Sequence, residues 1–251
     1  MTTGERDLLI IIATYNEREN LPILMRRLMS LDLSADVLVV DDASPDGTGD
    51  IAEALARQYG GHIHTKHRAG KLGYASALRE GFHFGLDERY RVIMTMDADL
   101  SHQPEKVPEL YAAAKRADVV IGSRYTPGGG TQNWPWYRRA LSRTASVLAR
   151  FMTGLRVRDC TGGFRAYRRE IIKASGMLDS TTEGYSFLVE ALYKCAAAGA
   201  QIVEVPITFV ERRRGASKIS RRIIFEAAWI LCKLAWKRIT GRKEPLRRGE
   251  E

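Results

Sequence analysis

The sequence RVIMTMDADLSHQP, residues 91–104, joins a short apolar run to an acidic turn, and it decides the fold. Its first half is typical of a strand buried in a parallel sheet. Two carboxylates one residue apart, Asp97 and Asp99, follow that run, and Pro104 can open the next helix. The stretch therefore predicts a buried strand that delivers acidic side chains to one edge of a sheet.

Asp97 and Asp99 form the first candidate site. In an extended strand alternate side chains share a face, so the two carboxylates are expected to point the same way. Like charges this close repel each other, and a divalent cation would remove the conflict. Hard carboxylate oxygens suit Mg²⁺ or Mn²⁺, with a substrate diphosphate completing the coordination shell. The alternative is a turn in which an Asp caps the helix after Pro104.

Strands and helices alternate around this stretch. Apolar runs predict strands at residues 7–14, 36–40, 62–66 and 118–122, and helical spacing predicts helices at residues 19–31, 50–59, 72–86 and 104–116. This alternation is the pattern of a doubly wound, mostly parallel, Rossmann-like α/β sheet, where ligands bind across the carboxyl ends of the strands. The polar residues expected at those ends are Tyr15, Glu17, Asp42, Asp97 and Asp99. Their clustering favours the cation site over the capping alternative.

The second half of the chain is less regular. Residues 126–131 (TPGGGT) are too glycine-rich for a regular element and are expected to form a mobile lid. Residues 137–153 predict a basic helix, and residues 159–164 predict a turn into a short strand. A further helix is expected at residues 186–198, before a strand pair or bent strand at residues 201–210.

The composition is that of a soluble globular protein, with 45% hydrophobic and 27% charged residues among 251. We find no secretory signal and no apolar run near the length of about 18 residues that a membrane span needs. The three cysteines are far apart and lack metal-ligand spacing: Cys160, Cys195 and Cys232. They predict reduced thiols in a cytosolic protein.

The net charge of +9 is confined to the C-terminal forty residues. Residues 1–211 carry 26 basic and 26 acidic side chains, whereas residues 212–251 carry 13 and 4. Residues 219–240 combine helical apolar spacing with tryptophan, lysine and arginine, which suits an amphipathic helix at a membrane interface. The alternative, a helix packed on the core with a basic solvated edge, is equally open. We expect a main α/β domain over residues 1–218, this helix, and a disordered tail over residues 241–251.

The chain resembles the dolichol-phosphate (polyprenol-phosphate) mannose synthases of glycosyltransferase family 2, which have the GT-A fold. The resemblance rests on an ordered set of motifs over most of the chain. These are residues 14–21 (TYNERENL), 41–48 (DDASPDGT), 96–102 (MDADLSH), 122–125 (GSRY), 133–138 (NWPWYR), 205–207 (VPI) and 215–218 (GASK). An Asp-x-Asp motif alone indicates little, but the ordered set is specific to this branch.

The resemblance implies that the donor is GDP-mannose and indicates which residues bind it. The residues expected to line the guanine and ribose pocket are Ala13, Tyr15, Glu17 and Asp42, and Ala98 joins the substrate-binding set. Asp97, Asp99 and Ser101 are expected to hold the Mg²⁺ or Mn²⁺ that bridges the diphosphate. Two positions depart from the family: Ala13 replaces a usual Pro, and Ser101 replaces the longer Gln of some relatives, so water is expected to complete the metal shell.

The resemblance also implies an acceptor site for a polyprenyl or dolichyl phosphate. Arg124, Arg138 and Ser142 are expected to meet the lipid phosphate, while Arg212 and Lys218 close over the donor phosphates. Arginine suits this task because its planar fork binds phosphate bidentately and keeps its charge. The expected catalytic residues are Asp99, Arg124, Arg212 and Lys218.

These expectations describe a metal-dependent dolichyl-phosphate β-D-mannosyltransferase that inverts the anomeric centre. The acceptor is already an oxyanion, so no general base is required. The alternative enzyme uses another sugar nucleotide, such as UDP-glucose, on a lipid phosphate. The resemblance implies a peripheral position on the cytosolic face of a membrane. A small membrane anchor subunit is a possible partner. No nucleic-acid partner is expected, because the sequence contains no nucleic-acid recognition motif.

Overall fold

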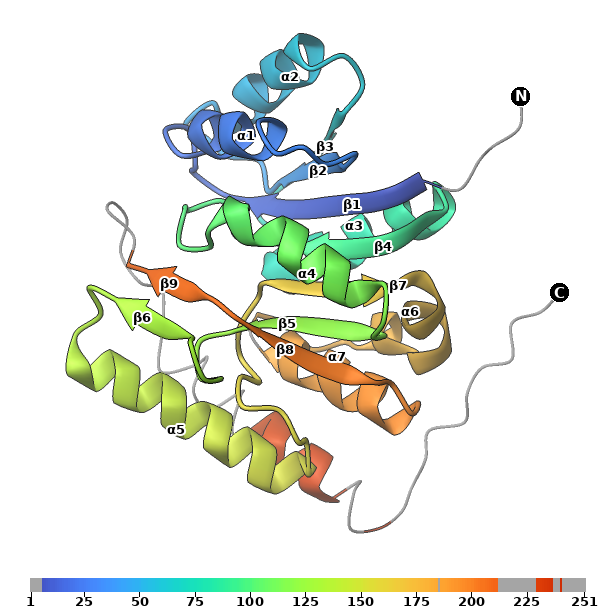
Figure 1. Ribbon diagram of the computed structural model, residues 1–251. Coiled ribbons are helices and arrows are strands. Elements are labelled where there is room, and N and C mark those ends of the chain that lie inside the picture. The colour runs from blue at the N-terminus through green and yellow to red at the C-terminus, as the bar shows by residue number, and fades with distance from the viewer. Residues whose placement is uncertain (1–5, 185, 212–228, 237–239, 241–251) are drawn as a thin grey trace, which may run out of the picture.

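The computed structural model describes residues 6–184, 186–211, 229–236 and 240 (Figure 1). In this part of the chain, one sheet has seven strands in the order β3-β2-β1-β4-β7-β5-β8, and β6 pairs with β9 beside it. The strands are β1 (Arg6–Thr14), β2 (Asp36–Asp41), β3 (Ile63–His67), β4 (Tyr90–Thr95), β5 (Val119–Ser123), β6 (Gly130–Gln132), β7 (Arg165–Arg168), β8 (Ile202–Pro206) and β9 (Thr208–Val210). The expected strand at residues 118–122 is confirmed as β5. Residues 201–210 were expected to form a strand pair or a bent strand; they form β8 and β9, which do not pair with each other but pair with β5 and β6.

The large sheet is parallel except at β7, which runs antiparallel to both of its neighbours, β4 and β5. This confirms the mostly parallel α/β architecture. A short strand was expected after the turn at residues 159–164, but its reversed direction was not predicted, because a four-residue segment shows neither its direction nor its neighbours. Its register pairs Thr95 with Arg165 and Val92 with Arg168, so β7 begins at the sheet edge where β4 ends.

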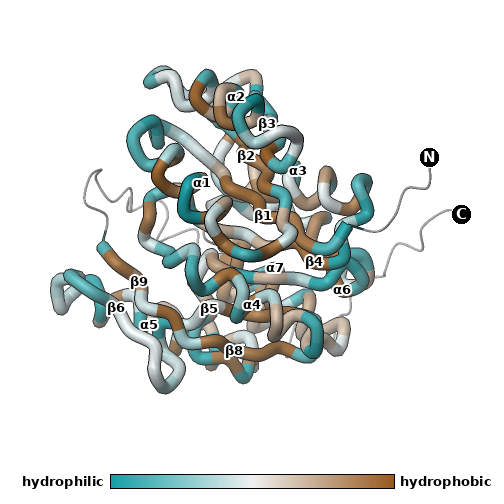
Figure 2. The backbone as a smooth tube through the Cα atoms, turned by 45° about the horizontal axis from the view of Figure 1, so that its top comes forward, coloured by the Kyte–Doolittle hydropathy of each residue, from teal (hydrophilic) through white to brown (hydrophobic). Residues whose placement is uncertain are grey.

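Helices cover both faces of the sheet. They are α1 (Leu21–Met29), α2 (Thr48–Gln58), α3 (Tyr74–Asp87), α4 (Val107–Ala114), α5 (Trp136–Thr153), α6 (Arg169–Ser175) and α7 (Ser186–Ala197), with short 3-10 turns at Pro104–Lys106 and Met177–Asp179. Side chains of α1, α2 and α4 pack with one set of alternate strand residues, and those of α3, α6 and α7 pack with the other. Figure 2, coloured by residue hydropathy, shows hydrophobic stretches along β4 and β8. The period of two in the strands thus divides the core into two halves.

Close packing of α3 against the sheet depends on two glycines. A Cβ on Gly81 would lie 2.5 Å from the Ile11 side chain, and one on Gly85 would lie 2.5 Å from the Ile93 side chain. These contacts bring α3 against β1 and β4, with its first residue at their carboxyl ends. The helix therefore connects the core to the edge where the polar residues cluster.

One expectation about the second half is corrected, and one helix was missed. Residues 130 and 131, expected in a lid, begin β6, where Gly130 pairs with Thr208 of β9. The short helix α6 was not predicted. Of the expected helix at residues 219–240, residues 229–236 are helical, and Ile230, Leu231 and Leu234 are buried in the core. The rest of that segment, apart from residue 240, and the tail lie outside the described residues.

Candidate active site

The loops after β1 and β2 are joined by hydrogen bonds. Thr14 Oγ1 donates to Asp41 Oδ1 at 2.9 Å, and the Glu17 backbone N–H donates to Thr48 Oγ1 at 2.9 Å. The Asn16 N–H donates to Ser44 Oγ at 3.0 Å, with Asn16 in a left-handed conformation at φ 63°. These bonds hold the two strand ends together. They leave Ala13, Tyr15 and Glu17 half-buried at one edge of the sheet.

Asp42 anchors a further segment, residues 68–73, to this edge. Its Oδ1 accepts a hydrogen bond from Arg68 Nη1, and its Oδ2 accepts one from the Gly73 N–H at 2.9 Å. Arg68 also donates to the Gly73 carbonyl at 3.1 Å. The same segment brings Lys71 Nζ to 3.9 Å from the ring centre of Tyr15. Tyr15 and Asp42 therefore share one site, to which the segment adds Arg68 and Lys71.

Arg68 and Lys71 were not among the expected site residues. Their signal lay in the sequence RAGKLG at residues 68–73, where basic residues and glycines follow β3. Glycine lets a backbone approach closely, and lysine and arginine bind phosphate or base acceptors.

The acidic turn differs from the extended geometry expected of it. β4 ends at Thr95, and Leu100 adopts a left-handed conformation at φ 62°. Asp99 Oδ1 accepts a hydrogen bond from the Ser101 N–H at 3.0 Å, which closes a turn. The prediction that Asp97 and Asp99 share a face by strand alternation is therefore wrong in its geometry, because the chain leaves the strand before both. Ala98 packs its side chain into the core, so any contact it makes with a substrate comes from its backbone.

Asp97 is held from two directions. The Tyr74 hydroxyl donates to Asp97 Oδ1 at 3.2 Å, and the Asp97 N–H donates to His102 Nδ1 at 3.1 Å. The His102 ring is buried, stacked on Phe164 at 5.0 Å between ring centres. Burial lowers the pKa of His102, outweighing the nearby carboxylates of Asp97 and Asp99, which would raise it. His102 therefore acts as a neutral acceptor that fixes the backbone of the turn.

The acidic turn offers a donor set that fits a hard divalent cation. Asp99 is 6% exposed and Ser101 is 1% exposed. Ser101 Oγ is buried and has no hydrogen-bond partner among the described residues. Among all the residues that the structure describes, no three or more His, Cys, Asp or Glu side chains form a cluster that could hold a metal ion. Two carboxylates and a hydroxyl suit an ion such as Mg²⁺, which is commonly bound by one or two carboxylates and substrate phosphates.

Arg124 lies in the core, where it pairs with Asp159. Its Nε and Nη2 donate to the two oxygens of Asp159 at 2.7 Å each, and its backbone N–H donates to Oδ2 at 3.1 Å. The side chains are 7% and 0% exposed. Burial would raise the pKa of Asp159, but the Arg124 guanidinium outweighs it and holds that pKa low. Asp159 was expected only as a turn residue; nothing in the sequence linked it to a residue 35 positions away.

Arg138 and Ser142 are connected to Arg124 through aromatic rings. The guanidinium carbons of Arg124 and Arg138 lie 5.7 and 4.4 Å from the ring of Trp134. The Tyr125 hydroxyl donates to Ser142 Oγ at 2.7 Å. The structure therefore brings three of the expected acceptor residues together at the start of α5. Arg212 and Lys218 lie outside the described residues.

The acidic turn and this arginine cluster meet at β9. The Phe209 ring lies 5.2 Å from the His102 ring and 5.6 Å from the Arg124 guanidinium carbon. The Val210 N–H donates to the Ser101 carbonyl at 3.1 Å. The residues predicted to hold a cation and the arginines predicted to bind the acceptor phosphate therefore share one edge of the fold.

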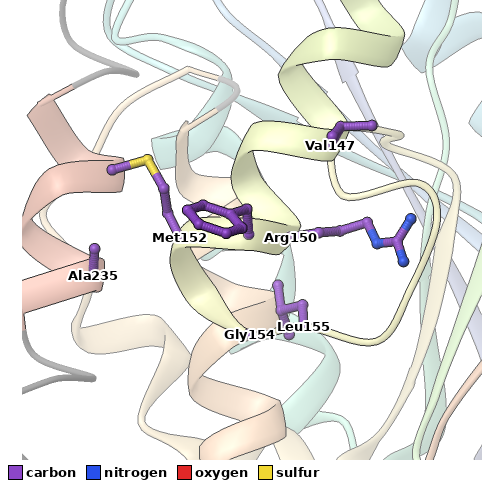
Figure 3. A pocket seen from close by; sticks show the side chains of 7 residues that line it. Val147, Arg150, Met152, Gly154, Leu155 and Ala235 are labelled. Atoms are coloured by element: carbon purple, nitrogen blue, oxygen red, sulfur yellow. The ribbon is translucent and has the colours of Figure 1, made fainter.

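The outer face of α5 exposes apolar side chains. The exposed large ones are Trp136, Tyr137, Leu141, Val147, Leu148 and Phe151, with Trp229 and Trp236 on the C-terminal helix. Exposed arginines, Arg139, Arg143 and Arg150, lie among them. A groove between the end of α5 and that helix, where Met152 reaches toward the segment bearing Ala235, is shown in Figure 3. The sequence predicted only a basic helix here; i, i+4 spacing of the apolar residues was the missed signal.

None of the described helices combines the length and the hydropathy needed to cross a membrane. The described residues also include three free cysteines, of which Cys160 and Cys195 are buried. Burial raises the pKa of Cys160 to about 12, which makes it a poor nucleophile.

Residues 9–176 match the protein family described as glycosyl transferase family 2. The chain is 44% identical over 240 residues to the polyprenol monophosphomannose synthase of Mycolicibacterium smegmatis, covering 95% of this chain and 89% of that one. It is 48% identical over 219 residues to the undecaprenyl-phosphate mannosyltransferase of Micrococcus luteus, covering 87% and 90%.

Among solved structures, a glucosyl-3-phosphoglycerate synthase from Mycobacterium tuberculosis, in complex with Mn²⁺, UDP-glucose and phosphoglyceric acid, matches with a TM-score of 0.65. It is 16% identical and covers 96% of this chain and 81% of that one. A likeness at this identity shows the fold alone. It supports the GT-A type of α/β fold expected from the sequence.

Proposed function

We propose that this chain, which belongs to glycosyltransferase family 2, transfers mannose from GDP-mannose to a polyprenyl or dolichyl phosphate with inversion. The product would be a polyprenyl β-mannosyl phosphate. The observation that carries the proposal is the meeting of the acidic turn and the arginine cluster at Phe209. The names of the relatives from M. smegmatis and M. luteus support the lipid phosphate acceptor and the mannosyl group.

The donor would lie across the carboxyl ends of β1, β2 and β4. Tyr15, Glu17 and Asp42, beside Ala13, would contact the nucleoside, and Lys71 supplies a cation at the Tyr15 ring. Asp97, Asp99 and Ser101 would hold Mg²⁺ or Mn²⁺, and the Mn²⁺ in the M. tuberculosis neighbour supports such an ion. When bound, the ion would neutralise charge on the diphosphate of the donor.

The acceptor would be positioned by arginines rather than activated by a base. A phosphate monoester carries a nucleophilic oxyanion at neutral pH, and Arg138 beside Ser142 would bind it near the donor. Arg124 is turned toward Asp159, whose carboxylate balances its charge, so a direct contact with the acceptor phosphate would require this pair to open. Arg212 and Lys218 remain predicted ligands of the donor phosphates.

The protein would work at a membrane surface, on its cytosolic face. Phe151 is 81% exposed and Trp136 is 75% exposed on α5, which also carries the expected acceptor residues. A helix with apolar and cationic side chains on its outer face suits the boundary between headgroups and acyl chains. The exposed tryptophans of the C-terminal helix would extend this contact, whereas its leucines pack on the core. A small membrane anchor subunit remains a prediction of the family resemblance.

The proposal is tested by incubating the full chain with radiolabelled GDP-mannose and short polyprenyl phosphates, with and without Mg²⁺. We expect label in the lipid fraction only when the metal is present. Calorimetric titration with GDP and with UDP separates the alternative donor, because preferential binding of UDP would contradict the mannose proposal. Absence of transfer to any lipid phosphate by metal-loaded protein would contradict it entirely.

A further inference from the structure

The first residue of α3, Tyr74, connects two parts of the site. Its hydroxyl donates to Asp97 Oδ1 at 3.2 Å, while the preceding Gly73 donates its N–H to Asp42 Oδ2 at 2.9 Å. One dipeptide therefore contacts the expected nucleotide site and the expected metal site. The position of Tyr74 is fixed by the packing of α3 on the sheet through Gly81 and Gly85.

The turn before β7 leaves room for the Tyr74 hydroxyl only because residue 163 is glycine. A Cβ at Gly163 would lie 2.8 Å from the Tyr74 hydroxyl oxygen and 3.4 Å from Asp97 Oδ1. The distance to the Tyr74 hydroxyl is too short for a carbon atom, so one of the two groups would have to move, whereas the distance to Asp97 Oδ1 is an ordinary van der Waals contact. The turn cannot easily withdraw, because the Gly163 carbonyl accepts a hydrogen bond from Thr95 Oγ1 at 2.6 Å.

We propose that Tyr74 is a positioning residue for the metal-binding carboxylate of Asp97, with Gly163 as the residue that makes room for it. The inference rests on the proposed function, which places the cation at Asp97. A hydrogen bond to Oδ1 restricts rotation of the carboxylate, so the direction of its lone pairs is set before a cation binds. Groups that orient metal ligands in this way typically contribute about 10- to 100-fold in metal affinity. A donor distance of 3.2 Å is long for a phenol, so we expect about tenfold.

The test compares Mn²⁺ affinity of the full chain in the presence of GDP, measured by calorimetry and by the electron spin resonance signal of free Mn²⁺. Tyr74→Phe is expected to weaken Mn²⁺ binding about tenfold. GDP binding without metal should be unchanged, because Gly73 still holds Asp42. Tyr111→Phe on α4 is the matched control, since its ring contacts Lys115 rather than the acidic turn.

A double-mutant cycle tests the mechanism. Gly163→Ala should weaken Mn²⁺ binding in the wild-type background, because its methyl group displaces the Tyr74 hydroxyl. The Tyr74→Phe variant lacks the hydroxyl oxygen, which is the atom nearest to a Cβ at residue 163. In that background Gly163→Ala should therefore cause little further loss of Mn²⁺ affinity. Contacting residues are expected to show such non-additivity.

Equal Mn²⁺ affinity in wild type and Tyr74→Phe would overturn the inference while leaving the proposed function in place. Fully additive losses in the cycle would overturn the role of Gly163. Wild-type protein that binds no Mn²⁺, or Asp97→Asn protein that binds it as tightly, would overturn both the inference and the proposed metal site. If Gly163→Ala fails to fold, the comparison of Tyr74→Phe with wild type still decides.

Discussion

Arg138 Nη1 donates a hydrogen bond to Glu211 Oε1 at 2.9 Å, so an arginine expected to bind the acceptor phosphate already holds an anion. The two side chains are 23% and 32% exposed, and they join α5 to the residue after β9. A substrate phosphate must compete with this carboxylate for the guanidinium.

Glu211→Gln should therefore lower KM for a polyprenyl phosphate. The variant keeps the shape of the side chain but removes its charge, and a pair this accessible is worth about 0.2–1 kcal/mol, or up to about fivefold. Steady-state kinetics with a short polyprenyl phosphate measures the effect. Glu109→Gln, which removes an exposed partner of Lys106, is the control. An increased KM would mean that Glu211 instead orients Arg138 for binding the acceptor phosphate.

Asp97→Asn and Asp99→Asn should each reduce mannosyl transfer by about 100-fold or more, because a metal contributes several kcal/mol of charge stabilisation. A chelator should have the same effect on the wild type. Radiolabel transfer to lipid is the measurement, and exposed Asp87→Asn is the control. Undiminished transfer in either variant, together with resistance to chelator, would show that the acidic turn is structural.

Asp159→Asn should destabilise the protein by about 3–5 kcal/mol. The substitution leaves the buried guanidinium of Arg124 without its counter-ion, and loss of one partner from a buried pair typically costs this much. Urea denaturation gives the free energy of unfolding. Asp46→Asn, at a more exposed turn, should cost much less. A loss below about 1 kcal/mol for Asp159→Asn would contradict the importance of this pair.

Stability should fall with pH below about 6.5 through His102. Burial lowers its pKa in the folded protein, so as the pH falls the unfolded chain binds a proton first. The free energy of unfolding contributed by this group is fully present above the unfolded pKa. It decreases as the pH falls toward the folded pKa, by at most about 1.4 kcal/mol per pH unit.

Urea denaturation at pH 7.5, 6.5 and 5.5 measures this dependence in wild type and His102→Gln. Their difference in free energy should shrink as the pH falls. A difference that stays constant with pH would show that His102 does not titrate differently in the two states.

Phe151→Glu on α5 should weaken binding to vesicles that contain anionic lipid. Burial of a phenylalanine side chain is worth about 1.5–3 kcal/mol, so the affinity should fall by about tenfold or more. Sedimentation with vesicles measures it, and GDP binding shows that the fold is intact. Ile23→Glu, at an exposed apolar residue of α1, is the control. Unchanged sedimentation of Phe151→Glu would contradict the membrane proposal.

The fold could be predicted because alternating apolar strands and amphipathic helices repeat along most of the chain. The arrangement of the site could not. Asp97 and Asp99 leave the extended conformation because the Ser101 N–H closes a turn on Asp99, and a strand pattern contains no signal for that bond. The partners of Arg124 and Asp97, namely Asp159 and Tyr74, are set by the reversed strand and by the packing of α3, which depend on contacts between distant segments.

The reversed direction of β7 determines where the chain should tolerate insertions. Its neighbours β4 and β5 end at the edge of the sheet that carries the candidate site, whereas β7 begins there, with Asp159 and Gly163 in the preceding turn. Residues inserted before Arg165 would disturb both the ion pair between Arg124 and Asp159 and the acidic turn. Added residues after Arg168, where α6 begins, would fall at the opposite end of the sheet. Among natural variants of this fold, length changes are therefore expected to accumulate on the outgoing side of β7.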